Sequence, residues 1–342
     1  MAITLKTDYF PCLPSARVGF ASAGFKFFRA IGLWILAACF SAAHADFPER
    51  PIRLVVPFTP SGAVDGIARL TAIEFGKALG QTVIVENKPG SGGTIGINFA
   101  GAAAADGYTM LLGNIALAAA PALYPKSGIN PQQFAPVALI GRSAYILAVK
   151  NDFPATTVAE LVALAKANPG KYNYASAGAG SAIHLAAELF KSKAAIDVVH
   201  VPYKGAGPAL NALMAGEVEM MFGSVSEMKS QIAGKRFRVL AVTSSKRMQA
   251  LPQLPTLAEG GIRDYEVAGW YGLYVPAKTP PEVLKKLQTA AAVAFKTVAM
   301  QQRLATYEME PATGGAVEAG EVLESETKRW SEIIRNAGIK VE

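Results

Sequence analysis

Strand-like and helix-like segments alternate along this chain, and this alternation limits the folds that it can adopt. The pattern predicts strands at 52–58, 82–88 and 108–114, with a helix from about 63 to 79 between the first two. Short apolar strands that alternate with helices are typical of α/β proteins with mostly parallel sheets. The sequence therefore predicts α/β architecture.

The segment from about 148 to 266 has its own complete set of strand and helix patterns, so two sheets are expected. One or two further strands are predicted at 137–150, where the first segment passes into the second. The last part offers one longer strand at 265–277 and then helices, so it is expected to return to the first sheet. We therefore predict a first lobe from 46–147 and 267–342, and a second lobe from 148–266.

The first 45 residues have the features of an export leader. Four basic residues precede an apolar run at 30–43, which ends in Ala43-His44-Ala45. This order is typical of a secretory signal peptide, and the run is too short to span a bilayer. Leu36-Ala37-Ala38-Cys39 also matches a lipobox, in which Cys39 would carry a lipid anchor. Both alternatives predict export out of the cytoplasm, with release of the chain in the first and a lipid anchor in the second.

Residue composition excludes several chemistries for the chain after the leader. Both cysteines, Cys12 and Cys39, lie within the leader, which excludes disulfides, a thiolate nucleophile and cysteine-ligated metals. Only His184 and His200 remain as imidazoles, so no zinc site or other cofactor is expected. The basic residues are scattered along the chain, so nucleic acid is not an expected partner.

Three turns, at 59–65, 89–97 and 176–182, follow predicted strands and precede predicted helices, which is where ligands bind in open α/β sheets. The spacing excludes nucleotide motifs, because Ile95 and Ile183 stand where G-x-G-x-x-G needs its third glycine. No Gly-Lys pair is followed by Ser or Thr as a P-loop requires.

Catalytic hydrolysis is also disfavoured by the sequence. The nucleophile elbow G-x-S-x-G does not occur in the chain. His200 lies within an apolar strand and is interpreted as a packing residue. His184 follows the candidate N-cap Ser181 by three residues, and it is expected either to face the cleft or to support the loop.

Recognition of an anion by the backbone fits these turns better. Ser61-Gly62 opens one predicted helix and the stretch from Ser176 to Ser181 leads into another. A helix N-terminus offers unpaired N–H donors and a partial positive charge, so two such ends could hold a carboxylate. Asp65 would either complement the helix dipole or orient the polar end of the ligand.

Six ordered blocks of sequence resemble one known family. They are PIRLVVPFTPSGAVDGIAR, VIVENKPGSGGTIG, DGYTMLLGN, KYNYASAGAGSAIHLAAELF, VHVPYKGAGPALNALMAGEVEMMF and VLAVTSSKRMQALPQLPTLAEGG. Together they are similar to the tripartite tricarboxylate transporter substrate-binding proteins, the Bug or TctC family, across 46–342. The resemblance implies a two-lobed periplasmic binding protein (type II-like), with two mainly parallel sheets, flanking helices and a ligand cleft between the lobes.

The resemblance also implies a function. Such a protein captures a small organic acid and delivers it to a tripartite tricarboxylate-type membrane permease, catalyses nothing and is a monomer. Two alternatives stay open: the same carboxylate-binding protein could act with a membrane sensor histidine kinase, or the chain could be an exported α/β hydrolase. The family's ligand-binding positions fall here on Phe58, Ser61, Gly62, Ala63, Asp65, Asn114, Ser176, Ala177, Gly178, Ser181, His184, Ser224 and Trp270.

Two positions depart from the family's usual pattern. Val64 stands where a hydroxyl side chain is usual, and Gly223-Ser224 replaces a polar pair that is usually Asp-Asn. Both changes predict a less polar far end of the pocket. The sequence thus predicts a ligand with one carboxylate and an aromatic or aliphatic remainder.

Overall fold

The computed structural model describes residues 47–60 and 62–341, so the predicted leader and Ser61 lie outside the described residues. Hydrogen-bonded strands follow one another in the order β2-β1-β3-β9-β4-β7-β5-β6, and β8 and β10 also pair with β4. The strands are β1 (Ile52–Val56), β2 (Val83–Asn87), β3 (Thr109–Gly113), β4 (Phe134–Val149), β5 (Asn173–Ser176), β6 (Val199–Pro202), β7 (Met220–Ser224), β8 (Arg238–Val242), β9 (Ala268–Pro276) and β10 (Glu310–Pro311).

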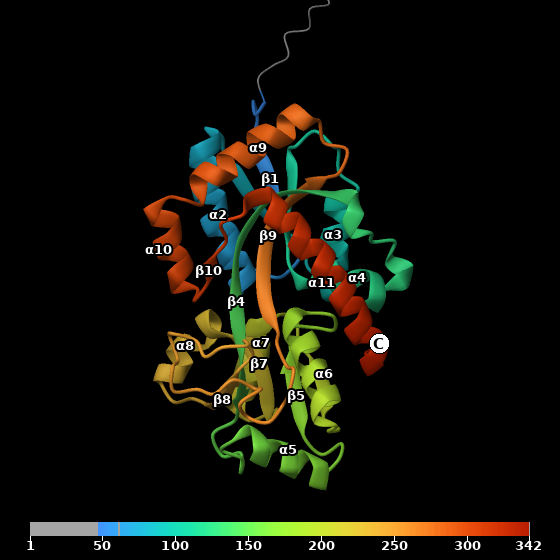
Figure 1. Ribbon diagram of the computed structural model, residues 1–342, viewed down its shortest axis with the longest axis vertical. Helices are drawn as coiled ribbons and strands as arrows, with labels where there is room; N and C mark the ends of the chain where they lie inside the picture. The colour runs from blue at the N-terminus through green and yellow to red at the C-terminus, as the bar shows by residue number, and fades with distance from the viewer. Residues whose placement is uncertain (1–46, 61, 342) are drawn as a thin grey trace, which may run out of the picture. The chain divides into compact units, whose positions relative to one another are not determined.

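Helices lie on both sides of these strands (Figure 1). The α-helices are α2 (Ala63–Leu79), α3 (Thr94–Gly101), α4 (Ile115–Leu123), α5 (Val158–Ala167), α6 (Ala182–Ala194), α7 (Ala206–Ala215), α8 (Val225–Ala233), α9 (Pro281–Ala294), α10 (Val298–Thr306) and α11 (Gly315–Ala337). Short 3-10 turns are η1 (Ser91–Gly93), η2 (Pro125–Ser127) and η3 (Pro131–Gln133). Within the described residues, no helix is long and apolar enough to cross a membrane.

Local sequence signals explain where several helices begin and end. Thr157 and Glu160 form a reciprocal capping box at the start of α5, and Ser181 caps α6. α2 ends at Gly80, whose φ of 69° is a left-handed conformation that glycine adopts without steric cost. These signals are short-range, so the sequence alone predicted the bounds of α2 and the cap of α6 closely.

The predicted α/β fold is confirmed, and the sheets are mixed. β1 pairs in parallel with β2 and β3, and β5 pairs in parallel with β6 and β7. The prediction of mainly parallel sheets holds for these two groups. The remaining pairs are antiparallel. They are β9 with β3 and β4, and β4 with β7, β8 and β10.

β4 and β9 run side by side between the two groups of strands (Figure 1). β4 is one continuous strand of 16 residues. The sequence alone leaves open whether this region forms one strand or two. Its first part pairs with β9, from Phe134 opposite Pro276 to Ala144 opposite Ala268, and its second part pairs with β7 and β8. The boundary predicted near 147 falls inside β4, so the division into lobes at that residue stays a prediction.

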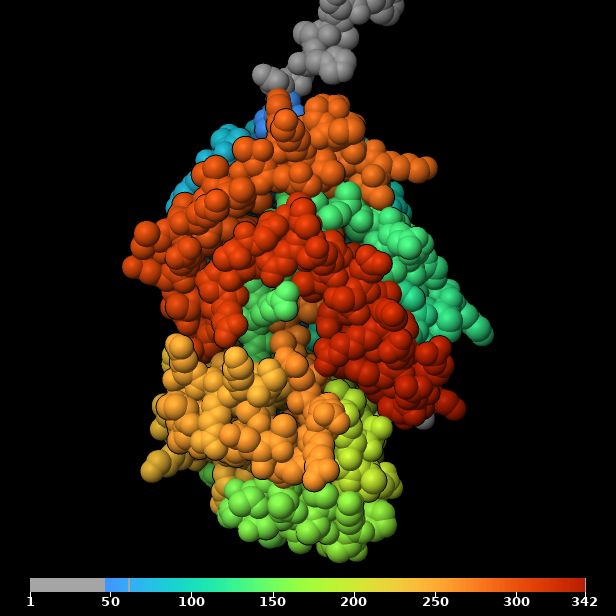
Figure 2. Space-filling model, in the orientation of Figure 1, coloured from blue at the N-terminus to red at the C-terminus, as the bar shows by residue number. Residues whose placement is uncertain are grey.

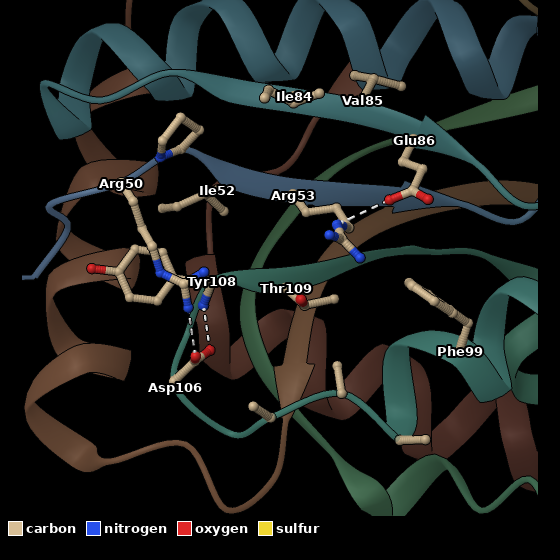
Figure 3. Close-up of a pocket in the computed structure, with 14 residues that line it drawn as sticks. Arg50, Ile52, Arg53, Ile84, Val85, Glu86, Phe99, Asp106, Tyr108 and Thr109 are labelled. Atoms are coloured by element: carbon tan, nitrogen blue, oxygen red, sulfur yellow. Dashed lines mark hydrogen bonds and ion pairs between the residues drawn. The ribbon is translucent and has the colours of Figure 1, made fainter.

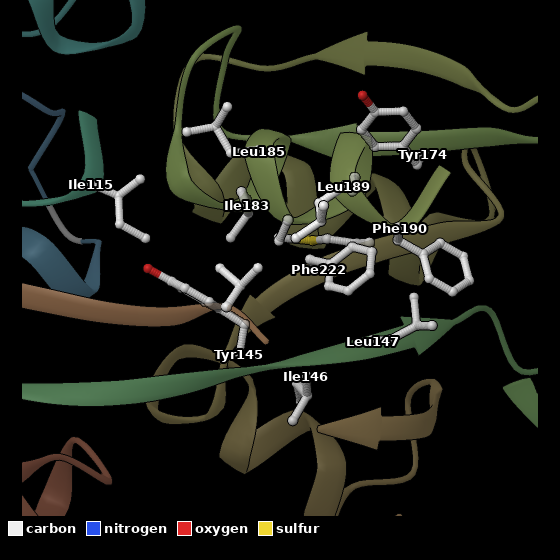
Figure 4. Packing of buried hydrophobic residues seen from close by; sticks show 14 of the residues in the cluster. Ile115, Tyr145, Ile146, Leu147, Tyr174, Ile183, Leu185, Leu189, Phe190 and Phe222 are labelled. Carbon is white, nitrogen blue, oxygen red and sulfur yellow. The ribbon is translucent and has the colours of Figure 1, made fainter. Parts of the chain in front are cut away.

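Two buried apolar clusters hold these elements together. α11 (red in Figure 2) packs over β4. The Tyr274 hydroxyl of β9 donates to the Ala319 carbonyl of α11 at 3.0 Å, which ties this helix to the sheet. Figure 4 shows Phe222 of β7 among Leu189, Phe190 and Leu147. The rings of Phe190 and Phe222 meet edge to face at 5.8 Å, which anchors α6 on its sheet.

The Phe222→Ala substitution tests the importance of this packing. Phe222 is fully buried, so its truncation leaves a cavity and is expected to lower the free energy of unfolding by about 3–5 kcal/mol. Denaturant unfolding measures this change. The matched control is Val317→Ala on α11, where the side chain is 72% exposed and the expected effect is within about 0.5 kcal/mol. Equal effects of the two substitutions would contradict the assignment of this core.

Candidate ligand-binding cleft

A small cavity lies where strands end and the helices that follow them begin. β1, β3, β5, β6 and β7 end beside it, and α2, α4, α6, α7 and α8 begin there. Tyr145 of β4 and Tyr271 of β9 complete its lining, and its volume is about 60 Å³. Ligands of open α/β sheets bind at the carboxyl ends of strands, so this cavity is the candidate site.

Seven of the predicted site residues line this cavity: Phe58, Gly62, Ala63, Asn114, Ala177, Ser181 and Ser224. Five others lie outside the lining: Asp65, Ser176, Gly178, His184 and Trp270. Ser61, the remaining predicted residue, lies outside the described residues. Val64, which the sequence analysis noted as a departure from the family's pattern, also lines the cavity. The lining residues that the sequence did not single out are Thr59, Tyr145, Ala182, Ile183, Gly205, Ala206, Glu227 and Tyr271.

The N-terminus of α2, which the sequence assigned to a ligand carboxylate, already holds a carboxylate of this chain. The Ala63 N–H donates to Glu227 Oε1 at 2.6 Å, and the Ser224 hydroxyl donates to Glu227 Oε2 at 2.8 Å. Gly62 has no side-chain cap, and Glu227 takes that role from a distant helix. Burial raises the pKa of Glu227 above its ordinary value, although these two hydrogen bonds oppose the shift.

Asp65 holds the first loop in place from behind the cavity. It is buried and forms a two-point ion pair with Arg69, with Arg69 Nε 2.8 Å from Asp65 Oδ2. The Asn87 amide donates both to Asp65 Oδ1 at 2.9 Å and to the Phe58 carbonyl at 3.0 Å. Asp65 and Asn87 thereby fix the turn after β1 against β2, which positions the wall that Phe58 forms.

The second predicted loop, between β5 and α6, is supported by two histidines. The Gly180 N–H donates to His184 Nδ1 at 3.1 Å, and Ser176 Oγ lies 2.6 Å from His200 Nε2. The two imidazole rings pack at 4.2 Å, and His200 also stacks on Tyr174. Of the two roles left open for His184, the structure shows support of the loop.

Burial lowers the pKa of both His184 and His200 to about 4, so both rings are neutral at pH 7. His184 Nδ1 accepts a hydrogen bond, which places the ring proton on Nε2. Protonation of Nδ1 would remove the acceptor of the Gly180 N–H. The shape of this loop therefore depends on a neutral imidazole.

Asn114 and Tyr271 reach the cavity, whereas Trp270 does not. Asn114 Oδ1 caps α4 by accepting from the Ala116 N–H at 3.0 Å. Trp270 is buried, and its ring meets the Tyr274 ring edge to face, with the ring centroids 6.4 Å apart. Because successive strand residues point to opposite faces, Tyr271 lines the cavity in place of Trp270. The sequence pattern at 265–277 is apolar on both faces and could not select between them.

A wider hollow of about 720 Å³ lies beside β1, β2 and α3 (Figure 3). Its charged side chains are paired with each other: Arg50 with Asp106 at 2.9 Å, and Arg53 with Glu86 at 2.9 Å. Arg50 also lies over the ring of Tyr108. None of the residues predicted for a ligand lines this hollow. Its charges are satisfied without a ligand, so we assign the site to the smaller cavity.

These features define an α/β solute-binding protein with a cleft lined by helix N-termini. A family model described as the tripartite tricarboxylate transporter family receptor (TctC) matches residues 67–339. The chain belongs to this family, the Bug/TctC binding proteins.

Relatives in sequence support this assignment. The chain is 38% identical over 290 residues to a UPF0065 protein in the tcbD-tcbE intergenic region of Pseudomonas sp. (strain P51), with 84% of this chain and 86% of that protein covered. The chain is also 31% identical to protein BugT of Bordetella pertussis, and the match covers 91% of this chain and 97% of BugT.

Solved structures agree with the fold. The periplasmic binding protein BugD is 34% identical with a TM-score of 0.81, and 86% of this chain and all of that chain are covered (100%). An R. palustris protein, Rpa4515, solved with adipate, is 34% identical with a TM-score of 0.82, with 87% and 100% covered. MatC from Rhodopseudomonas palustris, solved with bound malate, is 30% identical with a TM-score of 0.80, with 84% and 100% covered.

The neutral state of His184 predicts a specific loss of stability in acid. Its folded pKa of about 4 lies below the ordinary value of 6.5, so the unfolded chain binds more protons between these values. The stabilisation is complete above pH 6.5 and decreases as the pH falls towards 4, by roughly 3 kcal/mol for this group. Denaturant unfolding across this pH window measures the decrease.

His184→Asn is the matched variant, because its Oδ1 stands in the place of Nδ1 and can still accept from the Gly180 N–H but does not titrate. The variant is expected to lose about half of the pH dependence between 6.5 and 4, because His200, whose pKa is also lowered to about 4, titrates in the same window and remains. The carboxylates with lowered pKa values, such as Glu188, act at lower pH. An identical pH profile in native protein and variant would contradict this role of His184.

Proposed function

We propose that this protein binds a small carboxylate in the cleft and delivers it to the membrane permease of a tripartite tricarboxylate transporter. The observation that carries the proposal is the free N-terminus of α6. The N–H groups of Ala182 and Ile183 have no backbone acceptor within the described residues, and both residues line the cavity beside Ser181. Two N–H donors at a positive helix end are suited to a carboxylate.

Relatives support a carboxylate as the ligand. Rpa4515 was solved with adipate and MatC with malate, and their structures cover 87% and 84% of this chain. Both ligands carry carboxylates, the group that the α6 N-terminus would accept. The family description as a transporter receptor supports delivery to a permease, and the predicted leader supports a periplasmic location.

Capture requires the walls of the cleft to separate. Tyr124 Oη donates to the Ala179 carbonyl at 2.8 Å, and Ala63 is bonded to Glu227, so the walls touch around a cavity of about 60 Å³. A six-carbon ligand needs more room than this cavity gives. We propose a hinge at β4 and β9, which link the two groups of strands, with the ligand favouring the closed state by touching both walls.

Binding rather than catalysis is proposed although a serine and a histidine are adjacent. Ser176 Oγ and His200 Nε2 lie 2.6 Å apart, which resembles the first two members of a hydrolytic triad. Ser176 is fully buried and does not line the cavity, so a ligand there cannot reach its hydroxyl. The pair instead fixes the loop, since the same hydroxyl accepts from the Gly178 N–H at 3.1 Å.

A thermal-shift screen against carboxylic acids tests the proposal. A ligand at a hundred times its Kd adds about 2.7 kcal/mol of stability and raises the melting temperature by a few degrees in a protein of this size. The panel contains mono-, di- and tricarboxylates and amino acids, and the protein is unfolded and refolded first to remove copurified ligand. No shift with any carboxylate would overturn the proposal.

The Ala182→Pro substitution tests the α6 donors directly. Proline is tolerated at the first helical position but has no N–H, and Ser181 already has the extended backbone that precedes proline, with φ −66° and ψ 158°. Loss of a charge-assisted hydrogen bond is expected to weaken binding at least about tenfold. The control is Val298→Pro, the first residue of α10, which is 69% exposed and remote from the cavity lining. Equal affinities of the two variants would contradict the assignment.

A further inference from the structure

Glu227 lacks what the chain's other shielded carboxylates have, a cationic partner. Asp65 pairs with Arg69 at 2.8 Å, Glu74 with Lys77, Glu188 with Lys191, Glu219 with Lys150 and Glu326 with Arg329. Among the described residues, Glu227 is bonded only to neutral groups, the Ala63 N–H and the Ser224 hydroxyl. A charge shielded from water is normally paired, so the missing partner of Glu227 requires an explanation.

The cavity itself provides no cation for Glu227. Its described lining contains no Lys, Arg or His, and Glu227 is the one ionisable carboxyl among those residues. Tyr145 and Tyr271 face the same space, and the negative charge of Glu227 adds to the burial that raises the pKa of both phenols. The far end of the pocket thus carries one acidic group. The lower polarity that the sequence predicted there from Val64 and Gly223-Ser224 stays a prediction.

Two ends of opposite character are therefore built into one cavity. The α6 end presents the free N–H groups of Ala182 and Ile183, which favour a negative group. The α8 end presents the carboxylate of Glu227, which favours a positive group. A ligand that satisfies both ends carries a carboxylate and a cation.

We propose that Glu227 selects the ligand: the cleft takes a carboxylate that also carries a cationic nitrogen, such as an ammonium group, with the nitrogen donating to Glu227. This inference rests on the proposed binding of a carboxylate and names its class more closely. The ammonium replaces the Ala63 N–H or shares the carboxylate with it, because each carboxylate oxygen accepts more than one hydrogen bond.

The same geometry disfavours a ligand with a second carboxylate. That group would meet Glu227 at close range in a cavity with no cation to separate the two charges. The adipate and malate found in the solved relatives carry two carboxylates each, so this chain is expected to differ from those proteins in its preferred ligand. Glu227 is a binding residue that sets this preference.

Two series of ligands, one with six carbon atoms and one with four, test the proposal. One series is adipate, 6-aminohexanoate and hexanoate, and the other is succinate, 4-aminobutanoate and butanoate. Calorimetric titration of the native protein is expected to give an affinity for an amino acid at least about tenfold higher than for the diacid of its series. In Glu227→Gln, which keeps the shape but not the charge, the diacid is expected to gain and the amino acid to lose affinity.

Control variants separate this effect from folding and from net charge. Glu308→Gln removes the same charge from the ion pair with Lys229, outside the cavity lining, and is expected to keep the native preference. Glu227→Ala, with the melting temperature of each ligand-free variant, shows whether lost binding reflects lost folding.

Each outcome decides one claim. Tighter binding of the diacids to native protein, with carboxylate binding intact, overturns the selection by Glu227 and leaves the proposed function standing. A preference for amino acids that persists in Glu227→Gln also overturns the role of this residue. If the native protein binds no member of either series and no carboxylate in the wider screen, the proposed function fails, and this inference fails with it.

Discussion

The pairing of β4 with strands on both sides is the constraint on which the cleft depends. β9 lies beside its first part, while β7 and β8 lie beside its second part. The elements that end at the cavity are therefore placed relative to one continuous strand. Tyr145 of β4 and Tyr271 of β9 face the cavity from this linking region, so a hinge movement of the two groups of strands would act at the ligand site.

Helix N-termini and the carboxylate of Glu227 are the groups in the cleft that can bind a ligand. The N-termini of α2 and α6 both face the cavity, but Glu227 already occupies the Ala63 N–H of α2. The N-terminus of α6 stays open, and the loop before it is held by neutral His184 and by the Ser176–His200 contact. Rigid support outside the lining leaves the donors of Ala182 and Ile183 for a ligand, which is how the proposed carboxylate site is preorganised.

Much of the fold could be predicted from the sequence because its signals are local. Alternating segments predicted the α/β class and the helix from about 63 to 79, and the candidate N-cap Ser181 marked the start of α6. The antiparallel partners of β4 could not be predicted, because strand pairing depends on contacts between residues that are distant in sequence. The same limit applies to the choice between Trp270 and Tyr271, since both faces of that strand are apolar.

The loops of the site were predictable, whereas its charge was not. The motif blocks contain Phe58, Asn114, Ala177 and Ser181, and the departure after the fifth block drew attention to Ser224. All five line the cavity. Glu227 carries no motif, and only the fold brings its side chain to the start of α2. Asp65 and His184 were recognised as important positions, but their bonds to Arg69, Asn87 and Gly180 support the loops from behind.

A crystal structure of the protein with a carboxylate from the screen would test the central claim most directly. The account predicts the ligand's carboxylate within hydrogen-bond distance of the Ala182 and Ile183 N–H groups at the start of α6. A ligand bound instead in the hollow lined by Arg50 and Phe99, or one that points its carboxylate away from α6, would contradict the account.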